Sequence, residues 1–384
     1  MTKLTVIREV RVRGGATAFT DGGSAPRWIT AARVVMLLAF AATIPAVLGL
    51  SHGNRLLWTV LIAALPMFWT VAGYHVWRRI CPLAVFGQTG RLLGRPGTRK
   101  AGAWISAHYL LVQLALMIAC LTLRLVATNG SDVWLAGFLG AIAACALVTS
   151  FVYGGKTWCN FLCPIGMVEK IHTEPARSAT AAGEAMTSQC SPCVACKKHC
   201  PDIDVEQGYW KEAGDPSRRI AYFAWPGVVV GFYVYFNLVS GGWDYYFSGA
   251  WAYERAMAQL ATGPGWWFAT SVPRIVAVPL TLVAFGAASY ALFATIEAMA
   301  RSAWRRGHPS TTDDARAQAY ARIRHVMLAV AGFVAFNAFY AFAGQPTLRK
   351  LPLAVVASWN IAVVIASTAM LLRRIGRREH PYVR

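Results

Sequence analysis

The chain has 384 residues, of which 56% are hydrophobic and only 14% are charged, and its formal net charge is +20. A soluble globular protein carries about 25% charged residues, so this composition excludes an ordinary soluble domain and favours a chain that crosses a membrane several times. The basic residues stand in short clusters at the ends of apolar runs. That arrangement is typical of membrane topology signals, and we therefore expect no nucleic-acid binding.

Residues 1–28 hold basic side chains without an apolar core or a cleavage site, so we expect a cytoplasmic leader and no removable signal peptide. The apolar runs that follow predict eight transmembrane helices in contact with the lipid bilayer, because about 20 apolar residues span the hydrocarbon core. These helices are predicted near 29–50, 56–77, 103–127, 132–153, 220–240, 273–298, 325–344 and 352–372.

Arginine and lysine are concentrated on alternate connections, in the loop 78–102, after the sixth span and in the tail 373–384. Positive charge accumulates on the cytoplasmic side, so both termini are predicted there. The chain then divides into the leader, transmembrane helices 1–4 (29–153), a cytoplasmic segment (154–219), transmembrane helices 5–8 (220–372) and the basic tail. This is an all-α polytopic membrane protein with a small cytoplasmic insert.

Two Cys-Pro pairs follow the second and fourth spans. The first is Cys81-Pro82, and the second is Cys163-Pro164, which is preceded four residues earlier by Cys159. The two pairs are 82 residues apart and indicate an internal repeat of helical hairpins, with Trp77 standing where the second copy has Cys159. Repeated hairpins often frame one central site in membrane proteins.

The predicted insert contains C-S-P-C-V-A-C-K-K-H-C-P, with Cys190, Cys193, Cys196 and Cys200 at the C-x2-C-x2-C-x3-C-P spacing of a bacterial ferredoxin half. A zinc knuckle or a disulfide loop is the alternative. Zinc sites usually pair two separated C-x2-C units, and a disulfide needs an oxidising compartment. The spacing therefore favours a [4Fe–4S] cluster in a ferredoxin-like segment.

Seven cysteines are predicted on the cytoplasmic face, whereas two cubanes with full thiolate ligation need eight. In one arrangement, the first cluster takes three motif cysteines and either Cys81 or Cys163. The second then takes Cys200, Cys159 and the remaining cysteine. Its fourth position is either open or filled by a non-cysteine group, with His172, His199 and Asp202 as candidates. In the other arrangement a single cluster uses Cys190, Cys193, Cys196 and a fourth cysteine, and Cys81, Cys159 and Cys163 are spare or disulfide-exchange thiols. We favour two clusters, because unused exposed thiols invite oxidation.

Quinol oxidation releases protons, so a quinone site needs ionisable groups near an apolar pocket. His75, His108 and the intramembrane acid Glu297 are candidates, although an i,i+4 pair between Glu297 and Arg301 also explains the acid. A b-type haem needs two matched histidines, which His75 and His108 could supply. Interfacial histidines need no such partner, and we do not expect haem.

The motifs W-C-N-F-L-C-P-I-G (158–166), C-P-L-A (81–84) and 190–201 resemble the NapH/NosR/CcoG group of polyferredoxin-like membrane proteins. The resemblance covers roughly residues 55–240. It implies a bacterial inner-membrane protein that carries electrons between the quinone pool, or a soluble donor, and a partner oxidoreductase. The chain departs from the group by its single ferredoxin motif, by Trp77 and by the spans after residue 270.

Two other functions remain open from the sequence. A maturation factor would use the clusters to reduce a metal centre in another membrane enzyme. A transporter with a structural cluster predicts polar residues lining the middle of the membrane. The predicted spans contain few such residues, which argues against transport.

Overall fold

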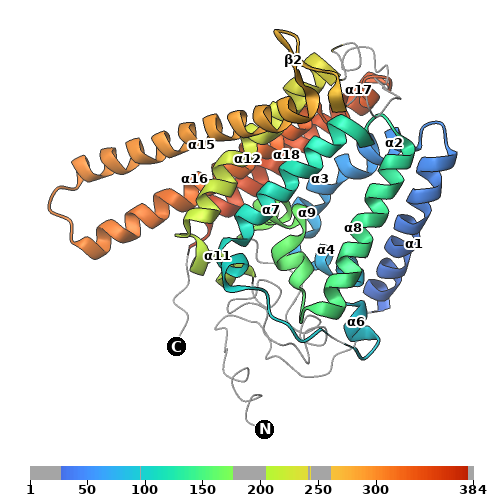
Figure 1. Ribbon diagram of the computed structural model, residues 1–384. Helices are drawn as coiled ribbons and strands as arrows, with labels where there is room; N and C mark the ends of the chain where they lie inside the picture. Colours follow the sequence, from blue (N-terminus) through green and yellow to red (C-terminus); the bar gives the residue numbers. More distant parts are fainter. Residues whose placement is uncertain (1–26, 96, 176–204, 241–242, 244–260, 379–384) are drawn as a thin grey trace.

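The computed structural model describes residues 27–95, 97–175, 205–240, 243 and 261–378, and Figure 1 shows an assembly of long helices. The first half contains, in chain order, α1 (Arg27–Gly49), α2 (Gly53–Leu56), η2 (Leu57–Leu61), α3 (Ile62–Ala72), α4 (Tyr74–Ile80), α5 (Pro82–Phe86), α6 (Thr89–Leu92), α7 (Ala103–Leu123), η3 (Arg124–Thr128), α8 (Asp132–Val152), η4 (Trp158–Leu162) and α9 (Pro164–Thr173). The second half contains α11 (Val205–Glu212), α12 (Pro216–Tyr235), η5 (Phe236–Ser240), β1 (Pro264–Trp266), β2 (Ala269–Pro273), α15 (Arg274–Gly307), α16 (Asp313–Phe342), α17 (Gln345–Leu348) and α18 (Leu353–Gly376). The segments labelled η are single π-helical turns, and the two strands form one antiparallel hairpin.

Eight helices in the described part of the chain are long and apolar enough to cross a membrane, in agreement with the prediction. They are Arg27–Gly49, Gly53–Ala72, Ala103–Thr128, Asp132–Val152, Pro216–Val239, Arg274–Gly307, Asp313–Phe342 and Leu353–Gly376. Polar caps fix several of their starts. Ser131 Oγ accepts a hydrogen bond from the Trp134 N–H at α8, and Asp215 Oδ1 accepts one from the Ser217 N–H at α12.

The second span ends earlier than its apolar pattern predicts. Gly73 adopts a φ of +82°, in the left-handed region that residues with a Cβ rarely enter. The chain therefore leaves α3 at this residue and starts the separate helix α4, which carries Trp77. The predicted span 56–77 thus corresponds to a membrane helix followed by a short helix that leads to Cys81.

The sixth and seventh spans are longer than the apolar runs that predict them. α15 continues from 298 to Gly307, and α16 begins at Asp313, with Thr312 as its capping residue and acids in its first turn. The apolar signal marks only the part that suits a membrane, whereas good helix formers and a capped start extend the helices beyond it. Figure 1 shows the two helices as a long hairpin that projects from the remaining helices.

The best-buried span is α12, which packs against α15, α16 and α7. Gly227 permits the closest of these approaches, because a Cβ there would lie 2.0 Å from the carbonyl oxygen of Phe285 on α15. Small residues of this kind let membrane helices pack backbone to backbone.

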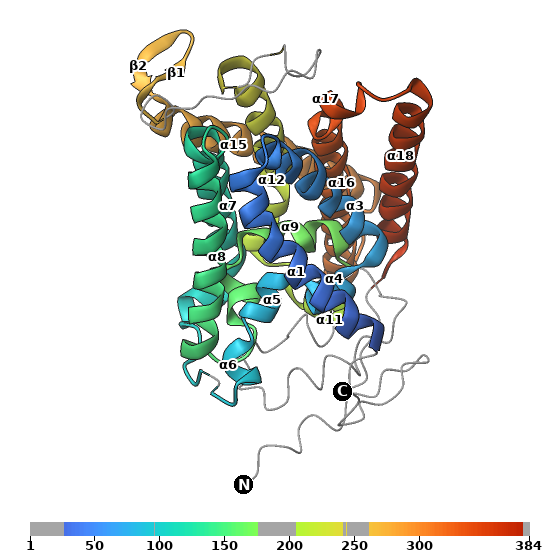
Figure 2. The same ribbon diagram turned by 90° about the vertical axis from the view of Figure 1, so that its right-hand side faces the viewer.

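The short helix α9 lies inside the helix assembly, where it contacts α3, α7 and α16 (Figure 2). Most of its side chains are buried, from Pro164 to Thr173. The sequence places this stretch in the polar segment 154–219, because α9 is too short and too charged to give a transmembrane signal. In the structure the first part of that segment returns into the bundle and belongs to its core.

Candidate iron–sulfur site

Cys163 occupies the junction between η4 and α9. It is the capping residue of α9, with φ −64° and ψ 118°, and Pro164 takes the first helical position, where its missing N–H costs nothing. The Cys163 N–H donates to the Trp158 carbonyl at 2.8 Å, and its own carbonyl accepts from the Gly166 N–H at 3.0 Å. The cysteine is therefore held by its backbone, and its side chain is free to serve as a ligand.

Cys81 has the same local structure at the junction between α4 and α5. Its φ of −57° and ψ of 124° resemble those of Cys163, and Pro82 begins α5. Its N–H donates to the Trp77 carbonyl at 2.8 Å, and its carbonyl accepts from the Ala84 N–H at 3.0 Å. The Cys-Pro repeat predicted from the sequence is thus also a repeat of backbone conformation.

The two copies differ in the turn before the cysteine. The Cys81 N–H reaches back four residues, as in an α-helix, whereas the Cys163 N–H reaches back five residues, as in a π-helix. Cys159 lies in this π-helical turn and is buried. Trp77, its counterpart, packs edge-on against Phe68 and Trp69. Isolated π-turns in helices often mark functional sites.

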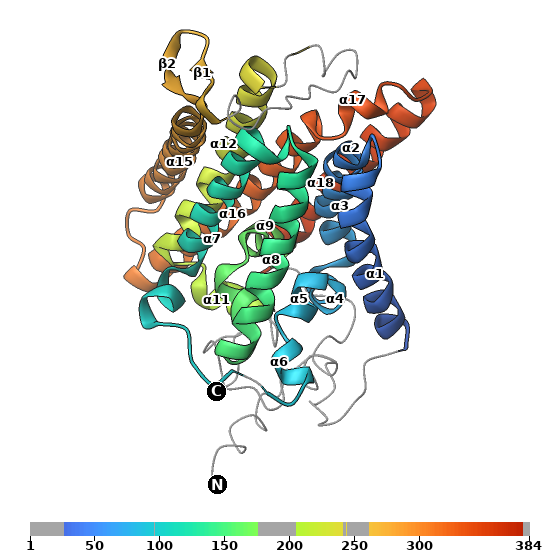
Figure 3. The ribbon, with the colours of Figure 1, turned by 45° about the vertical axis from the view of Figure 1, so that its right-hand side comes forward.

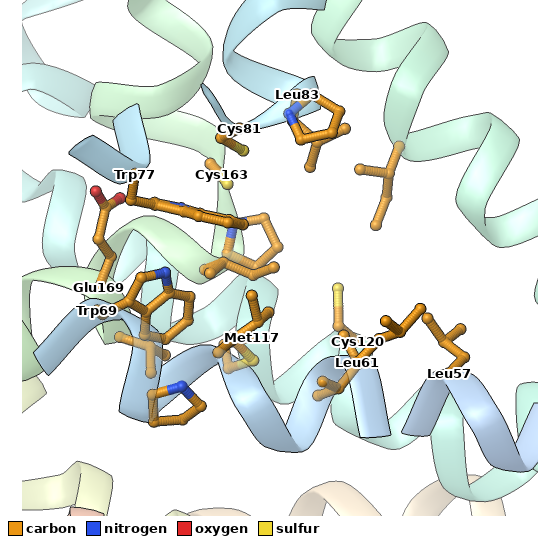
Figure 4. Close-up of a pocket in the computed structure, with 18 of the residues that line it drawn as sticks. Leu57, Leu61, Trp69, Trp77, Cys81, Leu83, Met117, Cys120, Cys163 and Glu169 are labelled. Carbon is orange, nitrogen blue, oxygen red and sulfur yellow. The ribbon is translucent and has the colours of Figure 1, made fainter. Parts of the chain in front are cut away.

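Cys81, Cys159 and Cys163 line one cavity of about 420 Å³, together with Trp77. Figure 4 shows Cys81 and Cys163 beside each other at one end of it, above the Trp77 ring. Burial raises the pKa of the Cys81 thiol to about 12, and the neighbouring Cys159 thiol also raises it. Burial and the same neighbour raise the pKa of Cys163. Thiols in such surroundings stay protonated until a metal replaces the protons.

These three cysteines fit an iron–sulfur cluster in chemistry and placement. Thiolates are the usual ligands of such clusters, and the cavity beside them is lined mostly by aromatic and aliphatic side chains. In the described part of the chain, no group of three or more His, Cys, Asp or Glu side chains has the geometry to hold a single metal ion. A cubane binds each ligand through a different iron and so spreads its ligands more widely than a single ion does.

The ferredoxin motif, Cys190, Cys193, Cys196 and Cys200, lies outside the described residues, as do His199 and Asp202. The ligand assignments that involve them therefore stay predictions. The two remaining cysteines lie in spans. Cys145 is exposed on α8. Cys120 on α7 lines the same cavity as Cys81, Cys159 and Cys163, which we call the cysteine triad.

The residues predicted for a quinone site do not form one cluster in the described structure. His75 is buried on α4, and His108 is half-buried on α7, where it stacks on Trp104. Glu297 is buried on α15 and forms ion pairs with Arg301, Arg219 and Arg324. The predicted Glu297–Arg301 pair is thus present within a larger group of charges.

Two polar side chains of α9, Glu169 and His172, line the same cavity as the three cysteines, which His75, His108 and Glu297 do not. Glu169 forms an ion pair with Arg78 at 3.6 Å, and both side chains are 3% exposed. His172 stacks on the Trp69 ring with 6.2 Å between centroids. The sequence singles out His172 only as a spare cluster ligand. The spacing of Ile165, Val168, Glu169 and His172, one face of a helix, could have indicated a shared cavity.

The sequence analysis also missed a buried polar cluster around Arg218 at the start of α12. The guanidinium binds the Glu174 carboxylate and, at 2.9 Å, the Glu212 carboxylate. Tyr222 donates to Glu174 at 2.9 Å, and Tyr109 donates to Glu212 at 2.6 Å. One arginine therefore joins the residues that precede and follow the segment 175–211, which contains the ferredoxin motif. Only the proximity of Arg218 to an apolar run hinted at its burial.

Comparison with protein families agrees with the cysteine site. A family described as a 4Fe-4S binding domain, Fer4_5, matches residues 135–171, which include most of α8, Cys159 and Cys163. No match to the chain was found among curated proteins or solved structures. The matched segment contains the second Cys-Pro copy and ends in α9 before the ferredoxin motif. The chain is therefore an iron–sulfur protein built on the helices of a multi-pass membrane protein.

Proposed function

We propose that this chain is a membrane-bound electron-transfer protein that passes electrons between a quinol or a soluble donor and a partner oxidoreductase. The observation that carries the proposal is the cysteine triad. Cys81, Cys159 and Cys163 line a cavity enclosed by membrane helices, and two of them lie in a segment that matches a 4Fe-4S binding domain. A cluster in this position lies next to the apolar interior of the helix bundle, from which a membrane-dissolved electron donor can reach it.

The chain's own residues hold and shield the cluster. The two Cys-Pro corners fix Cys81 and Cys163 through their backbones, and the π-helical turn supplies Cys159. When bound, a [4Fe–4S] cluster takes up and releases one electron at a time, at a potential that depends on charge and solvent exposure around it. Aromatic side chains, Trp77 among them, limit water at the site.

We further propose that two clusters are bound. The first uses Cys190, Cys193, Cys196 and either Cys81 or Cys163, and the second uses Cys200, Cys159 and the remaining cysteine of that pair. The arrangement of Cys81, Cys159 and Cys163 around one cavity supports the second cluster. Trp77 lies at the position that corresponds to Cys159. The first copy of the repeat therefore supplies one cysteine and the second copy supplies two.

The orientation in the membrane is also part of the proposal. The excess of arginine in 78–102 and in the tail supports a bacterial inner-membrane protein whose termini and clusters face the cytoplasm. An electron donor in the membrane then reaches the site through the helices, and a protein partner reaches it from the cytoplasmic side.

Electron paramagnetic resonance of the purified, dithionite-reduced protein tests the function. The wild type is expected to give the signal of a reduced [4Fe–4S] cluster and to lose it when an oxidised acceptor dye is added. Cys163→Ser is expected to remove or shift part of the signal. Cys145→Ser serves as the matched control, because Cys145 is an exposed cysteine of α8. A wild type without any such signal would contradict the proposal.

A further inference from the structure

The cavity at the cysteine triad extends well beyond the cysteines. It follows η2 and α3 along Leu57 and Leu61 and α7 along Met117 and Cys120, and Arg124 lines it as well. Figure 4 shows these apolar side chains and the Cys120 sulfur facing the open space. A volume of about 420 Å³ lies within the range of about 300 to 1,000 Å³ typical of small-molecule sites. We call this space the α9 cavity.

The polar side chains that line this cavity are few, and Glu169 and His172 of α9 are among them. His172 is 2% exposed, and its Nδ1 has no hydrogen-bond partner among the described residues. A buried polar atom without a partner is unusual in folded proteins and points to a ligand or a water. Burial lowers the pKa of His172 to about 3, and the Arg374 guanidinium also lowers it, so the ring is neutral at neutral pH. A neutral imidazole can accept as well as donate a hydrogen bond.

Glu169 lies one helical turn before His172 and lines the same cavity. Its carboxylate is kept near the Arg78 guanidinium, whose Nη2 also donates to Asn160 at 2.7 Å. α9 thus presents a neutral base and an ion-paired carboxylate to a largely apolar space that also contains the cysteine triad. A ligand that fits has a polar head with two oxygens and a long apolar tail.

We propose that the α9 cavity binds a quinol, with its ring between His172 and Glu169 and its tail along α3 and α7 toward Leu57. This inference rests on the proposed function, for which it names the electron donor and its site. It replaces His75, His108 and Glu297 as the candidate quinone residues, none of which lines the α9 cavity.

The reaction balances with the groups at hand. A quinol is oxidised to a quinone by the loss of two electrons and two protons. The electrons would pass one at a time to oxidised iron–sulfur centres, which the partner would reoxidise. His172 Nδ1 accepts the hydrogen bond of the quinol hydroxyl, and the two protons leave through the Glu169 carboxylate, one with each electron.

Two other occupants fit the cavity less well. A b-type haem needs axial ligands, usually a pair of histidines, and His172 is the one histidine of the described residues that lines the α9 cavity. A lipid acyl chain accounts for the apolar part but leaves His172 Nδ1 without a hydrogen bond. A quinone oxygen satisfies that atom.

Binding of a decyl-tailed benzoquinone to the full-length protein in nanodiscs tests the site, with empty nanodiscs subtracted. His172→Leu is expected to weaken binding about tenfold, the loss of roughly one hydrogen bond. His172→Gln keeps an amide donor and acceptor and should restore part of the affinity. His308→Ala, an exposed histidine at the end of α15, is the matched control and should bind as the wild type does.

Cys120→Phe tests the tail independently of the polar end. The larger side chain fills the cavity, so affinity for the decyl-tailed quinone should fall while affinity for a tailless benzoquinone is unchanged. Iron content reports whether each variant is folded. If folded His172→Leu and Cys120→Phe proteins both bind the decyl-tailed quinone as tightly as the wild type, the inference is wrong. Reduction of the clusters by a soluble viologen dye tests the proposed function separately and does not depend on quinone.

Discussion

At the scale of single residues, the site depends on close backbone approaches that leave no room for a side chain. Gly166 lies in the first turn of α9, where a Cβ would be 2.6 Å from Gln113 Nε2 and 2.9 Å from the Cys159 carbonyl oxygen. The same Gln113 amide donates to that carbonyl at 3.3 Å. The glycine therefore determines how closely α9 approaches the turn that carries Cys159.

Gly166→Ala is expected to push α9 away from η4 and to lower stability by about 1–3 kcal/mol, the usual cost of overpacking. The iron content should fall because Cys159 and Cys163 separate. Gly140→Ala on α8 is the matched control, since no atom lies within 4 Å of its added methyl group. Thermal midpoint and iron per chain check this, and equal values for both variants would contradict the packing argument.

His172 also predicts a pH dependence of stability. Its pKa falls from an ordinary value of 6.5 to about 3 in the folded chain, so below pH 6.5 the unfolded chain binds a proton that the folded chain does not. Stability should therefore decrease as the pH falls from 6.5 toward 3.

In His172→Leu this contribution is absent, so the drop in thermal midpoint between pH 7.5 and 5 should be smaller than in the wild type. The control is His308→Ala, which should retain the full drop. An unchanged drop in His172→Leu would show that His172 is not held neutral in the fold.

At the scale of elements, short pieces and not the long spans shape the site. α4, η4 and α9 are each too short or too polar to cross a membrane, yet they carry Trp77, Cys159, Glu169 and His172, which line the α9 cavity. The long helices around them supply the apolar walls. Figure 3 shows α9 behind α8, with α4 and α5 close to it.

Arg218 is expected to hold the segment that contains the ferredoxin motif. Arg218→Met leaves the buried Glu174 carboxylate without its partner, which typically costs about 3–5 kcal/mol for a buried pair. The thermal midpoint should fall, and protease cleavage within 175–211 should become faster.

The control for this substitution is Arg316→Ala, which breaks a pair with the exposed Asp313 and should change little, since exposed pairs contribute about 0–1 kcal/mol. A double variant with Glu174→Gln should recover part of the loss, because it removes the unpaired charge. Equal cleavage rates in Arg218→Met and the wild type would contradict the role of this arginine.

At the scale of the whole molecule, the sequence predicts what is encoded locally. Each span is a continuous apolar run, and each Cys-Pro corner is a short motif, so the eight helices and the repeat were predictable before the structure. The position of α9 inside the bundle was not predictable. Its polar residues indicate a surface segment, and their partners on other helices cannot be known from the sequence. The same holds for Glu297, whose Arg219 and Arg324 partners come from other helices.

The central claim is that a second cluster is bound at the helix junctions by Cys200, Cys159 and either Cys81 or Cys163. Iron and acid-labile sulfide per chain, measured on a Cys190→Ser, Cys193→Ser, Cys196→Ser triple variant, test it most directly. The wild type should contain about eight of each, and the variant should retain about four, because Cys200 is unchanged and Cys81, Cys159 and Cys163 still line the cavity. A folded variant without iron and sulfide would contradict the claim and leave a single cluster that depends on the ferredoxin motif.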